Sequence, residues 1–325
     1  MTGQPRLSVV IPTFNRPDHL RATVRQVLEQ RFTDCEVLVI DQSPPCVAQA
    51  QAARLAAEFS DPRLHYHWLE ARGTPNAKNE GIARSGGEII LFLDDDVILL
   101  SPEFLDAHVA RYADPAVGGV GGRVVERRIR PNARRTVSRV TRGGRTVENL
   151  LGQSPCTLES VKGANMSFRA RVFAELGGFD RRYTGTALLE EADLAFRVTD
   201  AGWTLVFEPR AELLHLSIPT GGVRVGDAQR TEWFRFRSTA YYVAKNRGRI
   251  GLLPFAATFG MIAGWRAVRW RSPGALPALV RAAYEGIRTA RLGPDDALPR
   301  RAGLKRISPA PTIPIEARAG CAIRT

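Results

Sequence analysis

The sequence predicts an α/β protein with a mainly parallel central sheet. Two observations support this fold class. Short apolar runs that resemble buried strands alternate with segments whose apolar residues recur at helical spacing. Polar residues gather where these runs end, at the edge where parallel sheets bind ligands. The chain has 325 residues, 44% of them hydrophobic and 24% charged, which is ordinary for one large domain or two small ones.

Four strands are predicted in the first hundred residues, each as a short apolar run. They cover residues 7–12, 35–41, 63–69 and 88–94. A helix is predicted after each strand, over residues 17–30, 46–59, 74–87 and 102–113. Pro17 suits a first helical turn, and the paired glycines Gly86 and Gly87 suit a helix end.

The next hundred residues continue this pattern less regularly. Residues 161–180 predict a short strand, a helix and a turn with paired glycines. Residues 186–216 predict a helix with an acidic start, followed by a pair of strands. Glu190 and Glu191 stand at that helix start, where the helix dipole favours negative charge.

Polar side chains follow three of the predicted strands. Asn15 and Arg16 follow the first strand, Asp41 closes the second, and the aspartates Asp94 to Asp96 close the fourth. One aspartate is common at a strand end because its side chain bonds nearby backbone groups. Three in succession repel each other, and the run EIILFLDDDVIL (88–99) holds no basic residue to offset them. Hard cations such as Mg²⁺ and Mn²⁺ prefer carboxylate oxygens, so we interpret the run as a metal site.

The net charge of +13 is unevenly distributed. Residues 1–223 hold 27 basic and 27 acidic residues, whereas residues 224–325 hold 19 basic and 6 acidic ones. Residues 122–145 form a further basic island with nine arginines and one glutamate. Such segments suit an anionic partner, and no nucleic-acid motif accompanies them, so nucleic acid is not an expected partner.

The C-terminal third also contains 16 consecutive residues without a charge, residues 250–265. Pro254 interrupts this run, which is short for a membrane-spanning helix. Arginines flank it, so a helix lying in the interface of an anionic membrane is expected, and a helix packed on the preceding domain is the alternative. The stretch from residue 293 is rich in Pro, Arg and Ala and is predicted to be disordered.

The four cysteines show no C-x-x-C spacing and no companion histidine cluster, which indicates a reducing compartment. Residues 1–15 contain no apolar segment of signal-peptide length. A cytoplasmic protein is therefore expected, attached peripherally to the inner face of the plasma membrane if the C-terminal segment binds lipid.

Seven ordered stretches together cover residues 7 to about 216. They are VVIPTFNRPDHL (9–20), VLVIDQS (37–43), GTPNAKNEGI (73–82), ILFLDDDV (90–97), GANMSFRARVFAELGGFD (163–180), EEADLAFRVTDAGW (190–203) and AELLHL (211–216). In this order they resemble the inverting glycosyltransferases of family 2, sugar transferases of a bacterial type that have the GT-A fold.

The resemblance implies a nucleotide-diphosphate sugar as donor, a Mn²⁺ or Mg²⁺ ion, and a saccharide, lipid-linked or other hydroxyl acceptor. It implies transfer of a hexosyl or deoxyhexosyl group in the assembly of a cell-surface polysaccharide or glycolipid. It assigns Asp96, Asp94 and His215 to the metal, with Asp94 toward the ribose. The residues implied on the donor side are Pro12, Thr13, Asn15, Arg16, Asp41, Lys78, Asn79, Asp94 and Asp95.

The resemblance also places the catalytic base and the acceptor side. The family presents E-D-x-D-L where this chain has Glu190-Glu191-Ala192-Asp193-Leu194, so Glu191 takes the place of the base and Glu190 precedes it. Gly163, Asn165 and Trp203 are the implied acceptor residues. The motif at the end of the second predicted strand also departs from the family pattern, because Asp41-Gln42-Ser43 replaces the more frequent D-D-G-S or D-N-G-S.

The predicted organisation is a GT-A catalytic domain over residues 1–223, followed by a basic helical extension over 224–292 and a tail. Within the domain, residues 1–116 form the donor half and residues 117–223 the acceptor half.

Two other functions fit parts of the sequence. The altered base motif suits a non-catalytic nucleotide-sugar-binding protein, and an aspartate pair after a strand also occurs in phosphoaspartyl hydrolases. In those hydrolases the nucleophile opens the domain, whereas here three strands precede it.

Overall fold

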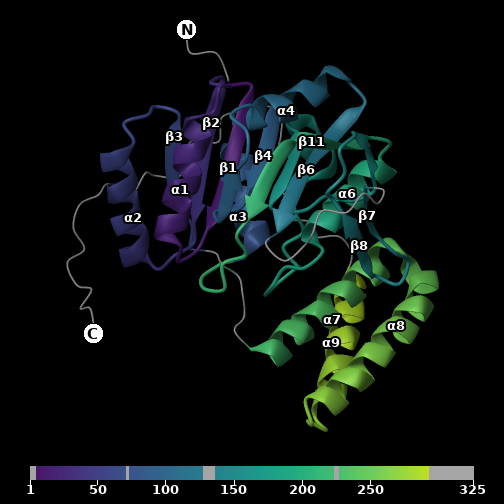
Figure 1. Cartoon of the computed structure of the whole chain (residues 1–325). Coiled ribbons are helices and arrows are strands. Elements are labelled where there is room, and N and C mark those ends of the chain that lie inside the picture. Colours follow the sequence, from purple (N-terminus) through teal and green to yellow (C-terminus); the bar gives the residue numbers. More distant parts are fainter. Residues whose placement is uncertain (1–4, 71–72, 127–135, 223–226, 293–325) are drawn as a thin grey trace.

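The structure is a computed structural model that describes residues 5–70, 73–126, 136–222 and 227–292. An α/β domain forms its upper part in Figure 1, and a group of helices projects below it. The predicted tail, residues 293–325, lies outside the described residues.

A nine-stranded sheet runs through the described part of the α/β domain in the order β3-β2-β1-β4-β10-β6-β11-β5, with β9 paired to β11. The first four strands of this order are parallel, as predicted. The strands are β1 Leu7–Thr13, β2 Cys35–Asp41, β3 Leu64–Trp68, β4 Ile89–Leu93, β5 Val97–Leu99, β6 Val117–Glu126, β9 Cys156–Leu158, β10 Asn165–Arg169 and β11 Thr204–His215.

The strand pair predicted before residue 216 is one strand, β11, which pairs with β6 over most of its length. Its register shifts between Glu208 and Glu212, around Pro209. Proline cannot donate a ladder hydrogen bond, and it occurs inside strands mainly at such irregularities. The chain therefore bends at Pro209 without leaving the sheet. His215 then lies at the carboxyl end of β11.

Helices cover both faces of the sheet, which gives a three-layer α/β/α sandwich. One apolar core joins β1, β2 and β4 to α1, α2 and α4 on one face, and the other joins them to α3, α5 and α6. Residues alternate along each strand between these cores, so Val9 and Val10 of β1 point to opposite faces. The helices are α1 Pro17–Leu28, α2 Pro45–Glu58, α3 Thr74–Arg84, α4 Phe104–Ala110, α5 Ala170–Leu176 and α6 Glu190–Asp200.

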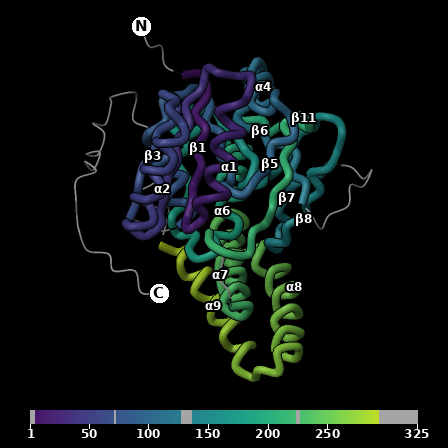
Figure 2. The backbone as a smooth tube through the Cα atoms, turned by 60° about the vertical axis from the view of Figure 1, so that its left-hand side comes forward, coloured from purple at the N-terminus to yellow at the C-terminus, as the bar shows by residue number. Residues whose placement is uncertain are grey.

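Three more helices, α7 Ala228–Asn246, α8 Gly248–Arg269 and α9 Ala275–Ala290, pack around their own apolar core. They extend away from the sheet in both views (Figures 1 and 2). The α6 residue Ala192 and the preceding Leu189 belong to the same core, so α7 is joined to the α/β domain by packing. The hairpin β7 Val137–Val140 and β8 Thr146–Asn149 lies against this group, with Gly143 touching the backbone of Pro254 in α8.

Helix α8 is long and apolar enough to cross a membrane by length and composition alone. It has 22 residues and a mean hydropathy of 1.2 over its most apolar window. It is longer than the uncharged run in the sequence because it begins at Gly248 and continues into the following arginines, to Arg269. Pro254 lies inside the helix and does not end it.

Candidate active site

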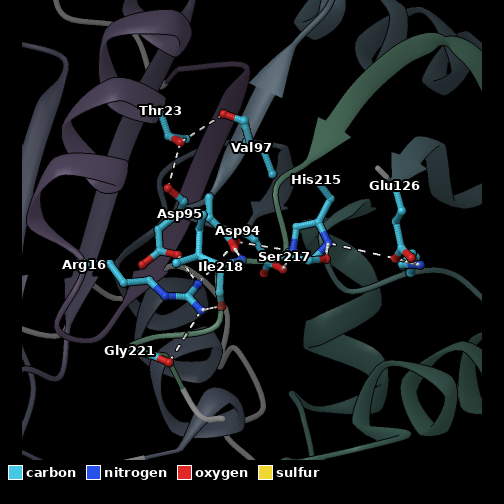
Figure 3. A network of polar contacts seen from close by, with 12 residues as sticks. Arg16, Thr23, Asp94, Asp95, Val97, Glu126, His215, Ser217, Ile218 and Gly221 are labelled. Carbon is cyan, nitrogen blue, oxygen red and sulfur yellow. Dashed lines mark hydrogen bonds and ion pairs between the residues drawn. The ribbon is translucent and has the colours of Figure 1, made fainter. Parts of the chain in front are cut away.

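Two aspartates and a histidine meet at the carboxyl edge of the sheet. Asp94 and Asp96 follow β4, and His215 ends β11. The antiparallel pairing of β11 with β5 sets His215 opposite Val97, the residue after Asp96. One ligand atom from each of the three side chains lies within 4.8 Å of the others. The His215 Nε2 atom is 3.3 Å from Asp96 Oδ1 and 3.5 Å from Asp94 Oδ2 (Figure 3).

The Asp96 carboxylate has one oxygen ready for a cation. Its side chain is 1% exposed, and Oδ2 accepts a hydrogen bond from the Ile218 amide at 2.9 Å. Oδ1 is buried without a hydrogen-bond partner and faces His215. Burial opposes ionisation of Asp96, but the nearby His215, the hydrogen bond from the Ile218 amide and the charge of Arg16 outweigh it and lower its pKa. An ionised oxygen beside a carboxylate and an imidazole nitrogen fits a divalent cation.

Glu126, the one glutamate of the basic island, stands on the other side of His215. It ends β6, and its Oε1 lies 4.0 Å from His215 Nδ1, while Ser217 Oγ is 3.2 Å from the same nitrogen (Figure 3). Burial disfavours a charged imidazole, but the neighbouring carboxylates of Asp96, Glu126 and Asp94 raise the pKa of His215 to about 9. Sequence reasoning missed Glu126, and its isolation among nine arginines is the signal that could have found it.

Arg16 connects three segments of the chain beneath this cluster. Its NH1 is 2.9 Å from Asp95 Oδ1 and 3.3 Å from Asp96 Oδ1, and its other nitrogens donate to the Thr220 and Ile218 carbonyls. Asp95 is 4% exposed and also accepts from the Thr13 hydroxyl at 2.7 Å. Both oxygens of Asp95 therefore have partners within the protein, and its assignment to the donor side stays a prediction.

A pocket opens above the aspartates, and several of the expected donor residues line it. Asn15 is not among the lining residues. Its side chain is exposed, and its backbone amide donates a hydrogen bond to Ser43 Oγ. The lining residues are Pro12, Thr13, Phe14, Arg16, Gln42, Thr74, Asp94, Asp95, Asp96, His215 and Gly222.

The structure corrects the prediction that Asp41 contacts the donor. Its side chain is completely buried, and its carboxylate accepts from the Gln51 side chain, the Tyr66 hydroxyl and the Ser43 amide. Gln42, the next residue, lines the pocket instead. Asp41 therefore supports the pocket wall from behind.

Lys78 and Asn79 of α3 also differ from their predicted role on the donor side. The Asn79 amide exchanges two hydrogen bonds with the backbone of Phe179, at 2.7 and 2.8 Å, so it ties α3 to that turn. The Lys78 ammonium forms a buried ion pair with Glu190. Burial disfavours the charged amine, but Glu190, Glu191 and Asp94 together raise its pKa. Lys78 thus lies between the aspartate cluster and the start of α6.

The two glutamates at the start of α6 have different surroundings. Glu190 is 3% exposed and bonded to Lys78. Glu191 is only partly buried, and no ion pair or side-chain hydrogen bond holds its carboxylate among the described contacts. Burial and the neighbouring Glu190 raise the pKa of Glu191 to about 7, against the opposing charge of Lys78. A carboxylate with that pKa is suited to accept a proton near neutral pH.

The family model of glycosyl transferase family 2 matches residues 8–177, which is more than half of the chain and includes the aspartate run. The chain belongs to glycosyl transferase family 2. The resemblance seen in the sequence is thereby confirmed.

Two family relatives and one solved structure give further detail. O-antigen biosynthesis protein RfbC of Myxococcus xanthus is 28% identical over 227 residues, covering 66% of this chain and 17% of RfbC. The GalNAc(5)-diNAcBac-PP-undecaprenol beta-1,3-glucosyltransferase of Campylobacter jejuni is 34% identical over 99 residues, covering 30% of this chain and 31% of that enzyme. The chain thus spans less than a third of either relative's length.

The mannosyltransferase PcManGT from Pyrobaculum calidifontis, solved in complex with GDP-Man and Mn²⁺, has a similar structure. The TM-score is 0.55 at 20% identity, over 86% of this chain and 74% of that one. This likeness confirms the predicted GT-A fold.

The structure corrects two of the three residues that the family pattern suggested for the acceptor. Asn165 is fully buried, and its amide bonds His108 and the carbonyls of Arg123 and Ala211. Trp203 precedes β11, whereas the metal-binding candidates lie at its other end, and its indole donates to Glu175. Gly163 stays a candidate, because a Cβ there would lie 3.4 Å from the Lys78 ammonium, beside the start of α6.

Proposed function

We propose that this protein is a metal-dependent inverting glycosyltransferase, which moves a sugar from a nucleotide-diphosphate sugar to a hydroxyl acceptor. The buried Asp96 Oδ1, which lacks a hydrogen-bond partner and faces His215, is the observation that carries the proposal. It lies in the pocket formed by the carboxyl ends of the parallel strands, where α/β proteins bind ligands.

Asp94, Asp96 and His215 would hold the Mn²⁺ or Mg²⁺ ion. The bound ion supplies Lewis-acid stabilisation of the negative charge on the departing diphosphate. Binding requires a neutral imidazole, so His215 must release the proton that its carboxylate neighbours stabilise. Arg16 keeps the loop after β11 in place through its bonds to the Ile218 and Thr220 carbonyls.

Glu191 would act as the base in a single displacement. The acceptor oxygen forms a bond to the anomeric carbon, the bond from that carbon to the diphosphate oxygen breaks, and the hydroxyl proton passes to the Glu191 carboxylate. The nucleoside diphosphate leaves with the electron pair, and the anomeric configuration inverts. Lys78 remains paired with Glu190, so Glu191 is the available carboxylate of the two.

The acceptor proposed is a lipid-linked or other saccharide hydroxyl. The name of the Campylobacter jejuni relative specifies an undecaprenol-linked substrate, and RfbC is named for O-antigen biosynthesis. An exposed apolar face of α8 and α9 supports attachment to an anionic membrane surface, where such acceptors are anchored. Its most exposed members in α8 are Ile250, Leu253, Met261 and Val268, each between 73% and 78% exposed.

Charge on the same helices favours the membrane surface over an uncharged partner. Residues 248–292 contain seven arginines and one acidic residue, Glu285. Trp265 is 54% exposed beside Arg266 and Arg269, which lie over its ring. Tryptophan and arginine together are typical of the lipid headgroup region. A peripheral position on the cytoplasmic membrane face is therefore the proposed location.

A donor screen tests the activity. GDP-mannose, UDP-glucose, UDP-N-acetylglucosamine and dTDP-rhamnose are each incubated with the full chain and Mn²⁺, with an undecaprenyl-diphosphate saccharide as acceptor. The release of nucleoside diphosphate is measured, and its loss with EDTA is expected. Binding of a nucleotide sugar without turnover of any donor would favour the non-catalytic alternative. Turnover of a generic aryl phosphate alone would favour the hydrolase.

A further inference from the structure

Lys245, which lies near the end of α7 and beyond the family-matched segment, reaches two buried aspartates of the α/β domain. Its ammonium is 2.7 Å from Asp180 Oδ2 and 2.8 Å from Asp193 Oδ1. Both aspartate side chains are 0% exposed, and Lys245 itself is 18% exposed. Asp193 belongs to α6, two residues after Glu191, so a helix of the C-terminal extension contacts the helix that carries the proposed base.

Neighbouring residues of α7 strengthen this contact. The Tyr241 hydroxyl donates to Asp180 Oδ2 at 2.6 Å, and the Asn246 amide donates to Asp193 Oδ1 at 2.9 Å. Within α6, Arg197 Nε lies 3.2 Å from Asp193 Oδ2. Burial opposes ionisation of Asp180, but Lys245 outweighs it and lowers its pKa. Lys245 is thus the cation that joins the two carboxylates.

The start of α6 needs such support because its backbone is strained. Ala187 has φ of 50° and Leu189, the residue before the helix, has φ of 71°. Side chains other than glycine adopt this left-handed region at a cost, and they remain there only where surrounding contacts hold them. Two buried ion pairs hold this turn, Lys78 with Glu190 and Lys245 with Asp193. Glu191 lies between the two anchored residues.

We propose that Lys245 is a positioning residue for the transfer reaction. By pairing with Asp193 and Asp180, it holds the first turn of α6 so that Glu191 faces the acceptor hydroxyl. This inference rests on the proposed role of Glu191. It also makes α7 a part of the catalytic unit, whereas the sequence had suggested a boundary near residue 223.

Removing the Lys245 charge leaves Asp180 without this cation, and among the described contacts it leaves Arg197 as the remaining cation beside Asp193. Two buried carboxylates that lose a shared cation draw water or move apart, and either response shifts the first turn of α6. A displacement of about 1 Å at a catalytic group can cost about 10²-fold in rate. The pocket is lined by residues at the ends of β1, β2, β4 and β11, together with Thr74 of α3 and Gly222, and the described contacts of Lys245 involve none of them.

The test compares Lys245→Met with wild-type protein in two measurements. Turnover is followed with the nucleotide sugar that the donor screen identifies, and binding of UDP and GDP is measured with Mn²⁺. We expect kcat to fall by about 10- to 100-fold while nucleotide affinity stays near the wild-type value. Lys245→Arg keeps a cation at this place and is expected to retain most of the turnover.

Hydrogen exchange provides a measurement that does not depend on activity. Amides of residues 187–196 should exchange faster in Lys245→Met, whereas those of β1 should not. The matched control is Arg171→Met, which removes a cation from a surface pair with Glu175 whose arginine side chain is 74% exposed. This control should change neither turnover nor exchange in α6.

Wild-type kcat in folded Lys245→Met, or unchanged exchange over residues 187–196, would overturn the proposal. A uniform increase of exchange across the sheet would also overturn it, because Lys245 would then affect only global stability. If Lys245→Met does not fold, Asn246→Ala removes one hydrogen bond to Asp193 and must still raise exchange in α6. If Glu191→Gln stays active, the assigned base is wrong, but the exchange result still decides whether Lys245 holds this turn.

Discussion

The Lys78 ammonium lies 2.5 Å from the Glu190 carboxylate, and the two side chains are 2% and 3% exposed. The pair joins α3 to the start of α6 and separates the functions of two adjacent glutamates. Glu190 neutralises a buried lysine, which leaves Glu191 available as the proposed base.

Loss of one partner of this pair should be strongly destabilising. Glu190→Gln leaves the buried Lys78 charge uncompensated, and we expect a loss of about 3–5 kcal/mol in the free energy of unfolding. The double variant Lys78→Met/Glu190→Met removes both charges and should lose less than Glu190→Gln. Urea denaturation of the three proteins measures these differences. A double variant less stable than Glu190→Gln would show that the pair itself stabilises the fold.

Glu191→Gln should abolish most of the activity without affecting the fold. The amide keeps the shape of the side chain but cannot accept the hydroxyl proton, and general-base catalysis typically contributes ~10²–10⁴-fold. We expect kcat to fall by that order, with donor binding near the wild-type value by calorimetry. If folded Glu190→Gln is inactive while Glu191→Gln is active, the base is the other glutamate. If both remain active, the base lies elsewhere.

The pH dependence of transfer should report the same carboxylate. Among the described residues, the charges that act on Glu191 are those of Glu190 in its own helix, Lys78 of α3 and Glu148 of β8. Because its pKa is raised to about 7, Glu191 is protonated below that pH and cannot act as a base. With Mn²⁺ and donor saturating, kcat should therefore fall as the pH drops from 8 to 6. A flat profile over this range would contradict the assigned pKa or the assigned base.

Asp96→Ala should eliminate metal-dependent donor binding while the fold survives. The change removes the buried oxygen that faces His215, so Mn²⁺ should no longer raise the melting temperature in the presence of UDP or GDP. His215→Ala should weaken the metal dependence less, because it removes one ligand of several. Wild-type nucleotide affinity of Asp96→Ala with Mn²⁺ present would exclude Asp96 as a ligand.

Charge placed on the exposed face of α8 should reduce membrane binding. Leu253→Glu/Met261→Glu alters two residues that are 78% and 73% exposed, and we expect weaker sedimentation with vesicles of phosphatidylglycerol and phosphatidylcholine. Salt should weaken binding of the wild-type chain as well. Leu100→Glu serves as the control, since Leu100 is an apolar residue of the α/β domain that is 50% exposed. Equal binding of the double variant and this control would contradict a lipid-binding face. If the wild-type chain is a dimer and the double variant is a monomer, the exposed face of α8 binds a second copy of the chain instead.

The fold class, the strands β1 to β4 and the family were predictable from the sequence. Each of these depends on local patterns, such as the apolar run before Asp94 or the helical spacing after Pro17. The approach of His215 to Asp96 was implied by the family resemblance, and the structure shows how it arises, through the pairing of β11 with β5. Pro209 lies within β11, where the sequence had suggested a break between two strands.

By itself, the sequence determined which side chains are chemically able to bind a cation, a nucleotide or a proton, because that ability belongs to the residue type. Only the tertiary structure decided which of them are free to do so. Asp41, Asn79 and Asn165 have suitable side chains, but their polar atoms bond partners that are 10, 100 and 57 residues away along the chain. Other contacts between distant residues give Glu190 an ion-pair partner, Lys78, and bring Lys245 to Asp193, 52 residues away. A buried polar group must be hydrogen-bonded or paired, and no local pattern reveals which partner the fold supplies.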